Sequence, residues 1–405
     1  MIRSFKTSIG ILFGLSLIFI QCTEDQMMEP VINKTVFVTD NITVDTTWSA
    51  GYDYILDGGI IVENGACLTI EPGTVIKGKP EEGANASYLL VARGGSLKAN
   101  GTEQAPIIFT STSDEITSEM VLNGTTVSPN LDPNADFGLW GGVIVLGNAP
   151  ISFSPGFEPQ IAYLPLSDLN GRYGGNNPDD SSGSLTYVSI RHSGINVGSV
   201  EFEGLILGGV GSSTVLDNIE VVANQDDGIE WLGGTCSASN ILVWGSGDDG
   251  LDTDQGWNGS CMNWIVLEPR SGSALELDGP EGPFEQGCNS FIDGTIYAGP
   301  NIDHIIDWDP NSNSAVVNLY IFGVDELYEA GNGIESFGGN GNCAIGSWEY
   351  TLPQGYDDAS ILADIITAGE AVEVSKNNNT VGADVTVFGW TLTSQTGKLA
   401  EIGLK

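Results

Sequence analysis

Positive charge is scarce in this sequence. Its 13 Lys and Arg residues face 53 Asp and Glu residues, which gives a formal net charge of −40 at pH 7. No lysine occurs between Lys98 and Lys376, and the only arginines in that interval are Arg172, Arg191 and Arg270. Such a chain repels the phosphate groups of nucleic acids and the headgroups of anionic lipids. The charge balance therefore excludes nucleic-acid binding as its function.

The ligands that zinc prefers are also scarce. The chain has two histidines, His192 and His304, and no Cys-x-x-Cys pair, so a zinc site is not expected. It contains neither a glycine-rich phosphate loop nor a nucleophile elbow. Long amphipathic helical patterns are nearly absent, whereas short runs of Val, Ile, Leu and Thr alternate with Gly and Asn. This pattern predicts an all-β fold.

A repeat of 22 residues lies in the middle of the chain. Asp-Asp-Gly-Ile-Glu at 226–230 is followed by Asp-Asp-Gly-Leu-Asp at 248–252, and an Asn-led apolar run precedes each copy. A looser third copy ends at 275–278 without the Asp-Asp-Gly. A fixed period of this length, with apolar runs separated by Gly and Asn or Asp, is typical of a solenoid. We therefore expect the chain to coil, one turn per repeat.

Five segments together resemble a family of exported Bacteroidota proteins. They are LTIEPGTVIKG (68–78), GGSLKANGT (94–102), LWGGVIVLGNAPI (139–151), YVSIRHSG (187–194) and DDGIEWLGGT (226–235). The resemblance implies a right-handed parallel β-helix of the pectin-lyase-like type, and it assigns no activity. We expect the β-helix over residues 36–350, with long loop excursions near 112–137 and 154–183 that could wall a groove.

The N-terminus resembles a bacterial lipoprotein signal. Arg3 and Lys6 precede an apolar run that is too short to span a bilayer, and Cys22 follows it directly. We expect residues 1–21 to be a signal peptide, Cys22 to be acylated and 22–35 to be a tether; ordinary cleaved secretion is the alternative. Acidic residues after the cysteine resemble the surface-export signal of Bacteroidota lipoproteins. The expected location is therefore the outer membrane, at the cell surface.

Five further cysteines are available for disulfides in an exported protein. The middle three are spaced by 25 and 27 residues, close to one solenoid turn. We expect the pairs Cys236–Cys261 and Cys288–Cys343, which leaves Cys67 unpaired.

Residues 351–405 depart from the repeat. Residues 357–366 have the pattern of a short N-capped helix, and 385–390 that of a strand. Because the open end of a solenoid needs a cover, we expect this segment to form a small C-terminal cap.

Carboxylates recur in the repeat. Consecutive turns of a parallel β-helix lie about 4.8 Å apart, so acids at the same repeat position should stack. Like charges at that distance repel by about 1 kcal/mol in water, and a hard cation offsets the repulsion. Oxygen ligands favour Ca²⁺, and the candidate ligands are Asp226, Asp227, Glu230, Asp248, Asp249 and Asp252. Alternatively, Asp and Asn recur because they suit solenoid corners, where they tolerate left-handed backbone and bond to it.

An enzyme is the second interpretation. Gln-Asp-Asp at 225–227 resembles a segment of the polygalacturonase-type glycoside hydrolases, but their Gly-His-Gly and Arg-Ile-Lys companions are missing. A calcium-dependent polysaccharide lyase would need a basic residue beside the acids, for which Arg270 is the first candidate. The catalytic set would then be Asp226, Asp227, Asp248, Asp249 and Arg270. An ion-pair role is the alternative for Arg270, and a turn role for His192.

Tryptophans crowd into the same repeats. Trp231, Trp244 and Trp257 could form a platform for sugar rings, or they could fill the interior of the coil. Taken together, these patterns favour a surface lipoprotein that acts as a non-catalytic binding or scaffold module for a glycan or an outer-membrane protein, with calcium. A β-helix lyase or hydrolase and a purely structural envelope component are the alternatives.

Overall fold

The computed structural model describes residues 34–155, 159–195, 202–284, 287–324, 333–335, 343–353 and 371–404. The chain divides into two units, Met1–Ile32 and Asn33–Lys405, and the second holds all of the described structure. The predicted signal peptide, the lipidation site Cys22, nearly all of the tether and the predicted helix at 357–366 lie outside the described residues.

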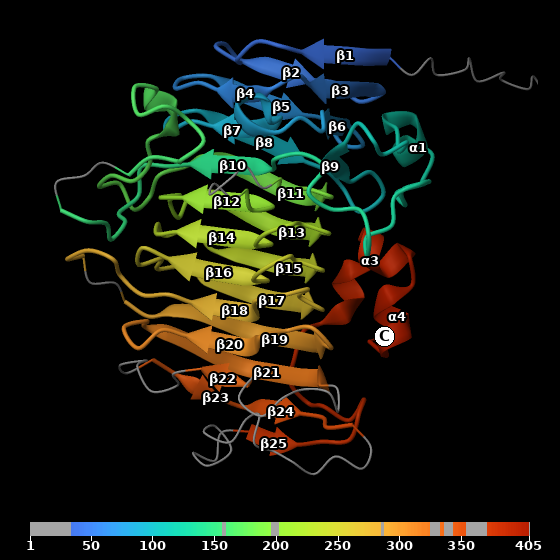
Figure 1. The fold of residues 1–405 in the computed structure, drawn as a ribbon, viewed down its shortest axis with the longest axis vertical. Helices are drawn as coiled ribbons and strands as arrows, with labels where there is room; N and C mark the ends of the chain where they lie inside the picture. The colour runs from blue at the N-terminus through green and yellow to red at the C-terminus, as the bar shows by residue number, and fades with distance from the viewer. Residues whose placement is uncertain are drawn as a thin grey trace, which may run out of the picture. The chain divides into compact units, whose positions relative to one another are not determined.

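The strands form two parallel sheets that follow one axis (Figure 1). The first sheet has 16 strands: β1 (Lys34–Val38), β2 (Thr46–Trp48), β3 (Tyr52–Leu56), β5 (Cys67–Ile70), β6 (Val75–Gly78), β8 (Ser96–Asn100), β9 (Ile107–Ser111), β11 (Gly183–Arg191), β13 (Val215–Val222), β15 (Ala238–Trp244), β17 (Ser260–Leu267), β19 (Asn289–Gly299), β21 (Ser314–Val324), β23 (Ile345–Gly346), β24 (Trp348–Tyr350) and β25 (Ala371–Glu373). The second sheet has nine: β4 (Gly59–Val62), β7 (Tyr88–Val91), β10 (Val143–Leu146), β12 (Leu205–Gly208), β14 (Ile229–Leu232), β16 (Leu251–Asp254), β18 (Ser273–Leu277), β20 (His304–Trp308) and β22 (Ile334–Glu335).

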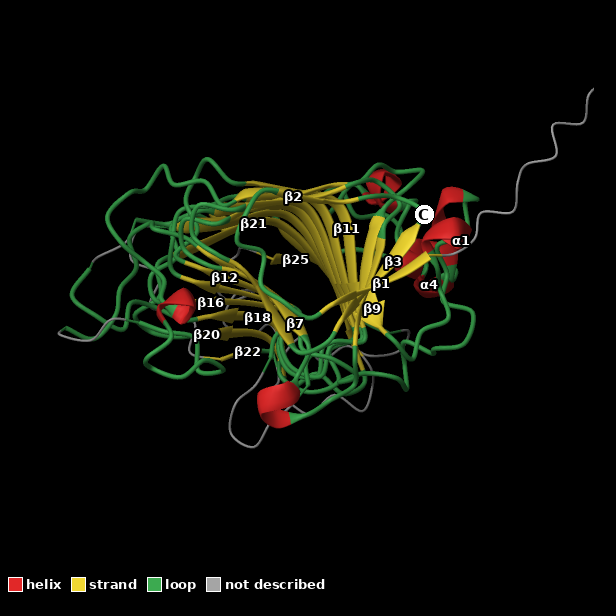
Figure 2. Cartoon of the chain, turned by 90° about the horizontal axis from the view of Figure 1, so that it is seen from above, coloured by secondary structure: helices red, strands yellow, loops and turns green. Residues whose placement is uncertain are grey.

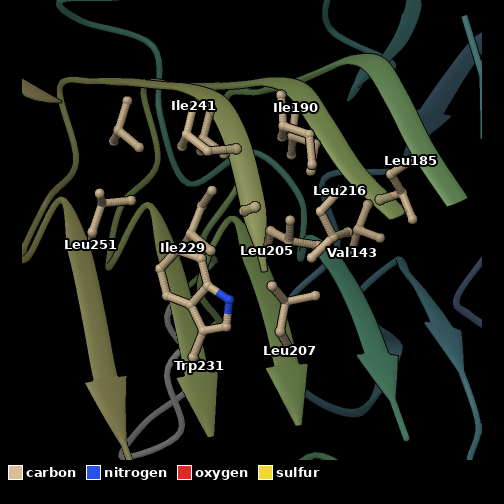
Figure 3. Close-up of a cluster of buried hydrophobic side chains, with 14 of the residues drawn as sticks. Val143, Leu185, Ile190, Leu205, Leu207, Leu216, Ile229, Trp231, Ile241 and Leu251 are labelled. Atoms are coloured by element: carbon tan, nitrogen blue, oxygen red, sulfur yellow. The ribbon is translucent and has the colours of Figure 1, made fainter. Parts of the chain in front are cut away.

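From β11 to β22, each turn of the coil adds one strand to each sheet, whereas the N-terminal turns add two strands to the first sheet. Seen along the axis in Figure 2, the first sheet bends around two sides of the interior and the second sheet closes the third. Alternate side chains point inward, because successive residues of a strand face opposite sides of the sheet. Figure 3 shows the result, with Ile229 and Trp231 of β14 and Leu251 of β16 facing Ile241 of β15 across the core. The prediction of an all-β, right-handed parallel β-helix is confirmed.

The bend within the first sheet is made by residues with left-handed backbone. Asn218, Asn240 and Asn263 occupy the same place in β13, β15 and β17 and have φ of 54°, 55° and 56°. Their side chains form a ladder, in which Asn263 Nδ2 donates to Asn240 Oδ1 at 2.7 Å and Asn240 Nδ2 donates to Asp217 Oδ1 at 2.8 Å. For this corner, the recurrence of Asn follows from backbone geometry and needs no ligand.

The excursion between β10 and β11 covers part of the second sheet. It contains the short helix η2 (Leu169–Gly171), and its apolar residues pack on the outer face of the N-terminal turns. The packed residues from the excursion are Ile151, Ile161, Tyr163, Leu164 and Tyr173, and those from the sheet include Ile61, Leu90, Ile144 and Ile206. The earlier excursion, between β9 and β10, contains α1 (Ser118–Leu122).

The C-terminal residues 375–404, here called the flank segment, run back along the first sheet. They contain η4 (Val385–Phe388), α3 (Leu392–Gln395) and α4 (Lys398–Ile402), which lie beside the coil in Figure 1. Apolar residues of this segment pack on the outward side chains of β13, β15 and β17, among them Leu242, Trp244 and Ile265. These residues of the predicted C-terminal segment bury their apolar face on the flank of the coil.

One predicted disulfide is absent. The structure joins Cys288 to Cys343, with 5.7 Å between their Cα atoms, and leaves Cys67, Cys236 and Cys261 as free thiols. The predicted Cys236–Cys261 pair is wrong because Ala238 occupies the register position opposite Cys261. Cys236 lies two residues away along the chain, and both thiols are buried in the core.

Candidate cation site on the second sheet

Four acidic residues stand one above another on the outer face of the second sheet. The strand register pairs Glu230 with Asp252, Asp252 with Glu276, and Glu276 with Asp307. All four face outward, because their neighbours along each strand, such as Ile229 and Trp231, fill the core. These four residues are called the acidic column below. The 22-residue repeat predicts its first pair, and the register extends it over four turns.

The acidic column begins where the cover of the second sheet ends. On earlier turns the same outward position holds Leu90, Ile144 and Ile206, which the excursion buries. The sheet then presents Glu230, next to Ile206 in register. Two tyrosines of the excursion border this change. Tyr163 donates a hydrogen bond to Glu203 Oε2 at 3.0 Å, and Tyr173 donates one to Gln255 Oε1 at 3.2 Å.

A second group of acids precedes the strands. Asp226, Asp227 and Asp248 each offer a carboxylate oxygen, and these oxygens lie within 4.8 Å of one another. Asp227 also accepts a hydrogen bond from the backbone N–H of Asp249 at 2.8 Å, and Asp249 accepts one from the N–H of Ser273. Asp249 and Asp227 thus accept hydrogen bonds from the turn backbone, as the corner interpretation expects, whereas Asp226 is half-buried and Asp248 is exposed.

Further acids lie at or beyond the ends of the strands and were not predicted as ligands. Burial raises the pKa of Asp254 to about 7, with a contribution from the negative charge of Glu281. Burial and the charge of Asp309 raise the pKa of Asp278 to about 6. Glu203, which precedes β12, completes the surroundings of Glu230. The spacing of the repeat could not reveal Glu203 and Glu281, since they lie in loops that do not follow the repeat.

The acids of the column hold their protons more tightly than free carboxyls do. Burial is the largest cause of the raised pKa of Glu230, followed by the charges of Glu203 and Asp254. Burial and a hydrogen bond with Asp249 raise the pKa of Glu276 to about 9. The charges that act most strongly on these groups are other carboxylates, so each one opposes the ionisation of its neighbours.

Asp252 is the most deeply placed member of the column. Its exposed fraction is 7%, and its pKa is raised well above the usual range by burial and by the charges of Asp227 and Glu230. Its Oδ1 is buried and accepts no hydrogen bond. A buried acceptor without a donor is destabilising by about 1–3 kcal/mol. A cation between the carboxylates would bind this oxygen and would also offset the repulsion between the negative charges.

Comparison with protein-family models identifies the fold. The model described as "Pectate-lyase like beta helix domain" matches residues 40–331. The chain belongs to this family. The matched part of the β-helix domain contains the whole acidic column. No curated protein and no solved structure matches the chain. In the described part of the β-helix protein, no helix is long and apolar enough to cross a membrane.

Two arginines of this β-helix domain, Arg270 and Arg191, have partners outside the acidic column. Arg270 donates to the backbone carbonyl of Asn224, and its guanidinium lies 3.8 Å from the centroid of the Phe137 ring. Burial alone lowers its pKa to about 10. Arg191, the last residue of β11, is fully buried on the outer side of the first sheet, where it donates to Ser189 Oγ at 2.7 Å. Arg270 is thus directed to a ring and a backbone carbonyl, and Asn224, which offers that carbonyl, lies two residues before Asp226. His192, a candidate turn residue, has φ of 57° and is buried.

The tryptophans of the β-helix domain do not form a sugar platform. Trp231 and Trp257 are fully buried in the core, where their rings stack with 4.8 Å between centroids. Trp244 is 5% exposed beneath the flank segment. The predicted platform is therefore wrong, and the alternative, that these rings fill the coil or cover its flank, is correct. Strand alternation turns Trp231 inward, and the indole N–H of Trp257 donates to the carbonyl of Cys236 at 3.0 Å.

Proposed function

We propose that this β-helix protein is a non-catalytic binding module that holds divalent cations, calcium in particular, along the acidic column. The observation that carries the proposal is Asp252, a buried carboxylate with an unpartnered oxygen between Glu230 and Glu276. Every donor offered there is a carboxylate oxygen, and Ca²⁺ prefers such ligands to nitrogen or sulfur.

The spacing of the turns supports the same ion. Ca²⁺ binds oxygen at about 2.3–2.6 Å. Neighbouring strands lie about 4.8 Å apart, which is roughly twice that distance. An ion midway between two turns would therefore meet one carboxylate from each. Asp226, Asp227 and Asp248 offer a further set of oxygens at one edge of the column.

The expected setting is the cell surface. The lipoprotein-like N-terminus would attach the protein to the outer membrane through Cys22. In that position, bound cations could bridge the acidic face to an anionic polysaccharide or to an outer-membrane protein. A lyase of the same fold is less well supported, because Arg270 stacks on Phe137 and binds a backbone carbonyl.

Calcium titration tests this function directly. The metal-free protein is melted in chelator and at rising calcium, and bound calcium is counted by equilibrium dialysis. Because an ion that binds only the folded state stabilises it, we expect the melting temperature to rise with calcium. Matched sodium chloride should not reproduce the rise. Equal melting temperatures with and without millimolar calcium would refute the proposal.

A further inference from the structure

A second concave site lies where the last strands of the first sheet meet the start of the flank segment. It is a cavity of about 820 Å³. Small-molecule sites in proteins occupy about 300–1,000 Å³. Its lining includes Tyr297, Phe322, Thr351, Leu352, Glu373 and Lys376. No member of the acidic column lines it, so this site is separate from the proposed cation site.

Aromatic rings form one wall of this cavity. The ring centroids of Tyr297 and Phe322 lie 5.0 Å apart, and Phe322 stacks on Tyr320 at 5.1 Å. Phe322 is 2% exposed, whereas Tyr297 is half-buried and offers part of its ring to the cavity. The aromatic wall is thus held by packing on one side and accessible on the other.

The absence of a side chain at Gly323 leaves the space that the Tyr297 ring occupies. A Cβ at this position would lie 2.1 Å from Cδ2 of Tyr297, and the backbone has φ of 75°. Any other residue would both strain the backbone and displace the ring. The position of the Tyr297 ring in the aromatic wall therefore depends on a glycine at position 323.

The rim of the cavity is polar and carries both charges. Glu373, Ser375 and Lys376 are exposed, and the ammonium group of Lys376 lies 5.8 Å from the centroid of the Phe322 ring. A free metal ion does not fit this mixture, because an ammonium group competes with it for the single carboxylate. A wholly apolar ligand would gain no hydrogen bond from this charged rim.

We propose that this cavity binds a neutral hexose unit of a glycan. The apolar face of the sugar ring would lie on the accessible part of Tyr297, whose ring packs against the buried Phe322. Its hydroxyl groups would donate to Glu373 and accept from Lys376. Sugar recognition is thereby assigned to this cavity, which none of the three tryptophans that the sequence suggested lines. The inference goes beyond the proposed function and does not depend on calcium.

Titration calorimetry with methyl α-glucoside, methyl α-mannoside and methyl β-galactoside tests the inference. At least one of these hexosides should bind saturably, in chelator as well as in calcium. Tyr297→Ala should weaken that binding by about tenfold or more, because it removes the aromatic wall. Tyr297→Phe should keep it, and Glu373→Gln and Lys376→Gln should each weaken it.

Two controls separate this result from a folding defect and from the cation site. Phe37→Ala removes an exposed ring on the first strand and should leave hexoside binding unchanged. Asp252→Asn should also leave it unchanged, so failure of the cation proposal would not hide a sugar site. The inference is overturned if none of the three hexosides binds saturably, or if Tyr297→Ala binds as tightly as the unaltered protein.

Discussion

Individual residues on the second sheet face outward or inward according to strand alternation alone. On β16, Leu251 and Thr253 point into the coil, and Asp252 between them points out toward Glu230 and Glu276. No side chain donates to its Oδ1, and its burial disfavours the ionised form. Without a cation, Asp252 is therefore expected to lower the stability of the fold, and a bound cation would offset that cost.

Asp252→Asn is expected to stabilise the protein in chelator and to remove most of its response to calcium. The amide keeps the size of the side chain and is neutral without binding a proton, so it avoids the free-energy cost of burying this carboxyl, a gain of about 1–3 kcal/mol. Thermal melting with and without calcium measures both effects. Glu103→Gln, at an exposed site away from the column, is the matched control and should behave like the unaltered protein. A variant that still gains the full calcium shift would place the ion elsewhere.

At the scale of elements, the flank segment is attached to the coil by a buried carboxylate. Glu220 of β13 is fully buried and accepts hydrogen bonds from the N–H groups of Leu392 and Thr393, at 3.0 and 2.9 Å. It also accepts one from Ser189 at 2.6 Å, and Ser189 in turn accepts from Arg191. Glu220 thus binds the start of α3, and its negative charge partly compensates the positive charge of the buried Arg191.

Glu220→Gln should destabilise the protein and loosen the flank segment. The amide loses the negative charge near Arg191 and turns a donor toward the N–H groups, a loss of about 1–3 kcal/mol. Denaturant unfolding measures the loss, and limited proteolysis should cut within 375–404 earlier than in the unaltered protein. Glu268→Gln breaks the more exposed pair with Lys398, 2.7 Å apart, and should change stability by less than about 1 kcal/mol. Equal effects of the two substitutions would contradict the assigned role of Glu220.

The whole molecule combines a large negative charge with acids that resist ionisation. Its net charge is −40, and the pKa values of Asp278, Asp254 and Glu276 rise to about 6, 7 and 9. In the unfolded chain these groups titrate near pH 4. Between pH 4 and pH 9 the folded protein therefore binds more protons than the unfolded chain.

Without calcium, stability should fall as the pH rises from about 5 to about 9. A group whose pKa is raised by folding stabilises the fold fully below its unfolded pKa and loses that effect as the pH passes the folded value. Calcium prefers the ionised carboxylates, so it should flatten this dependence and raise the melting temperature most at high pH. Melting curves at pH 5, 7 and 9, in chelator and in calcium at constant ionic strength, check both effects. A melting temperature in chelator that increases over this range would contradict the assigned pKa shifts.

Much of the coil could be predicted because its determinants are local. The 22-residue repeat and the in–out alternation of each strand determine the register, and they place Asp252 beside Glu230 without any knowledge of distant contacts. The same local reasoning explains Asn218 and Asn240 at the corner, where left-handed backbone favours Asn. Local patterns in the sequence are thus enough to predict an all-β solenoid, the pitch of its coil and the Glu230–Asp252 pair of the acidic column.

What covers each face of the coil depends on contacts between distant parts of the chain. Trp244 points outward from β15, and whether it meets solvent depends on the flank segment, whose α4 begins at Lys398. Cys261 lies opposite Ala238 because the loop between β16 and β17 sets the register, which spacing in the sequence does not reveal. Glu203 and Glu281 reach the acidic column from loops outside the repeat. These contacts join residues far apart in the chain through loops of irregular length, so no local pattern encodes them.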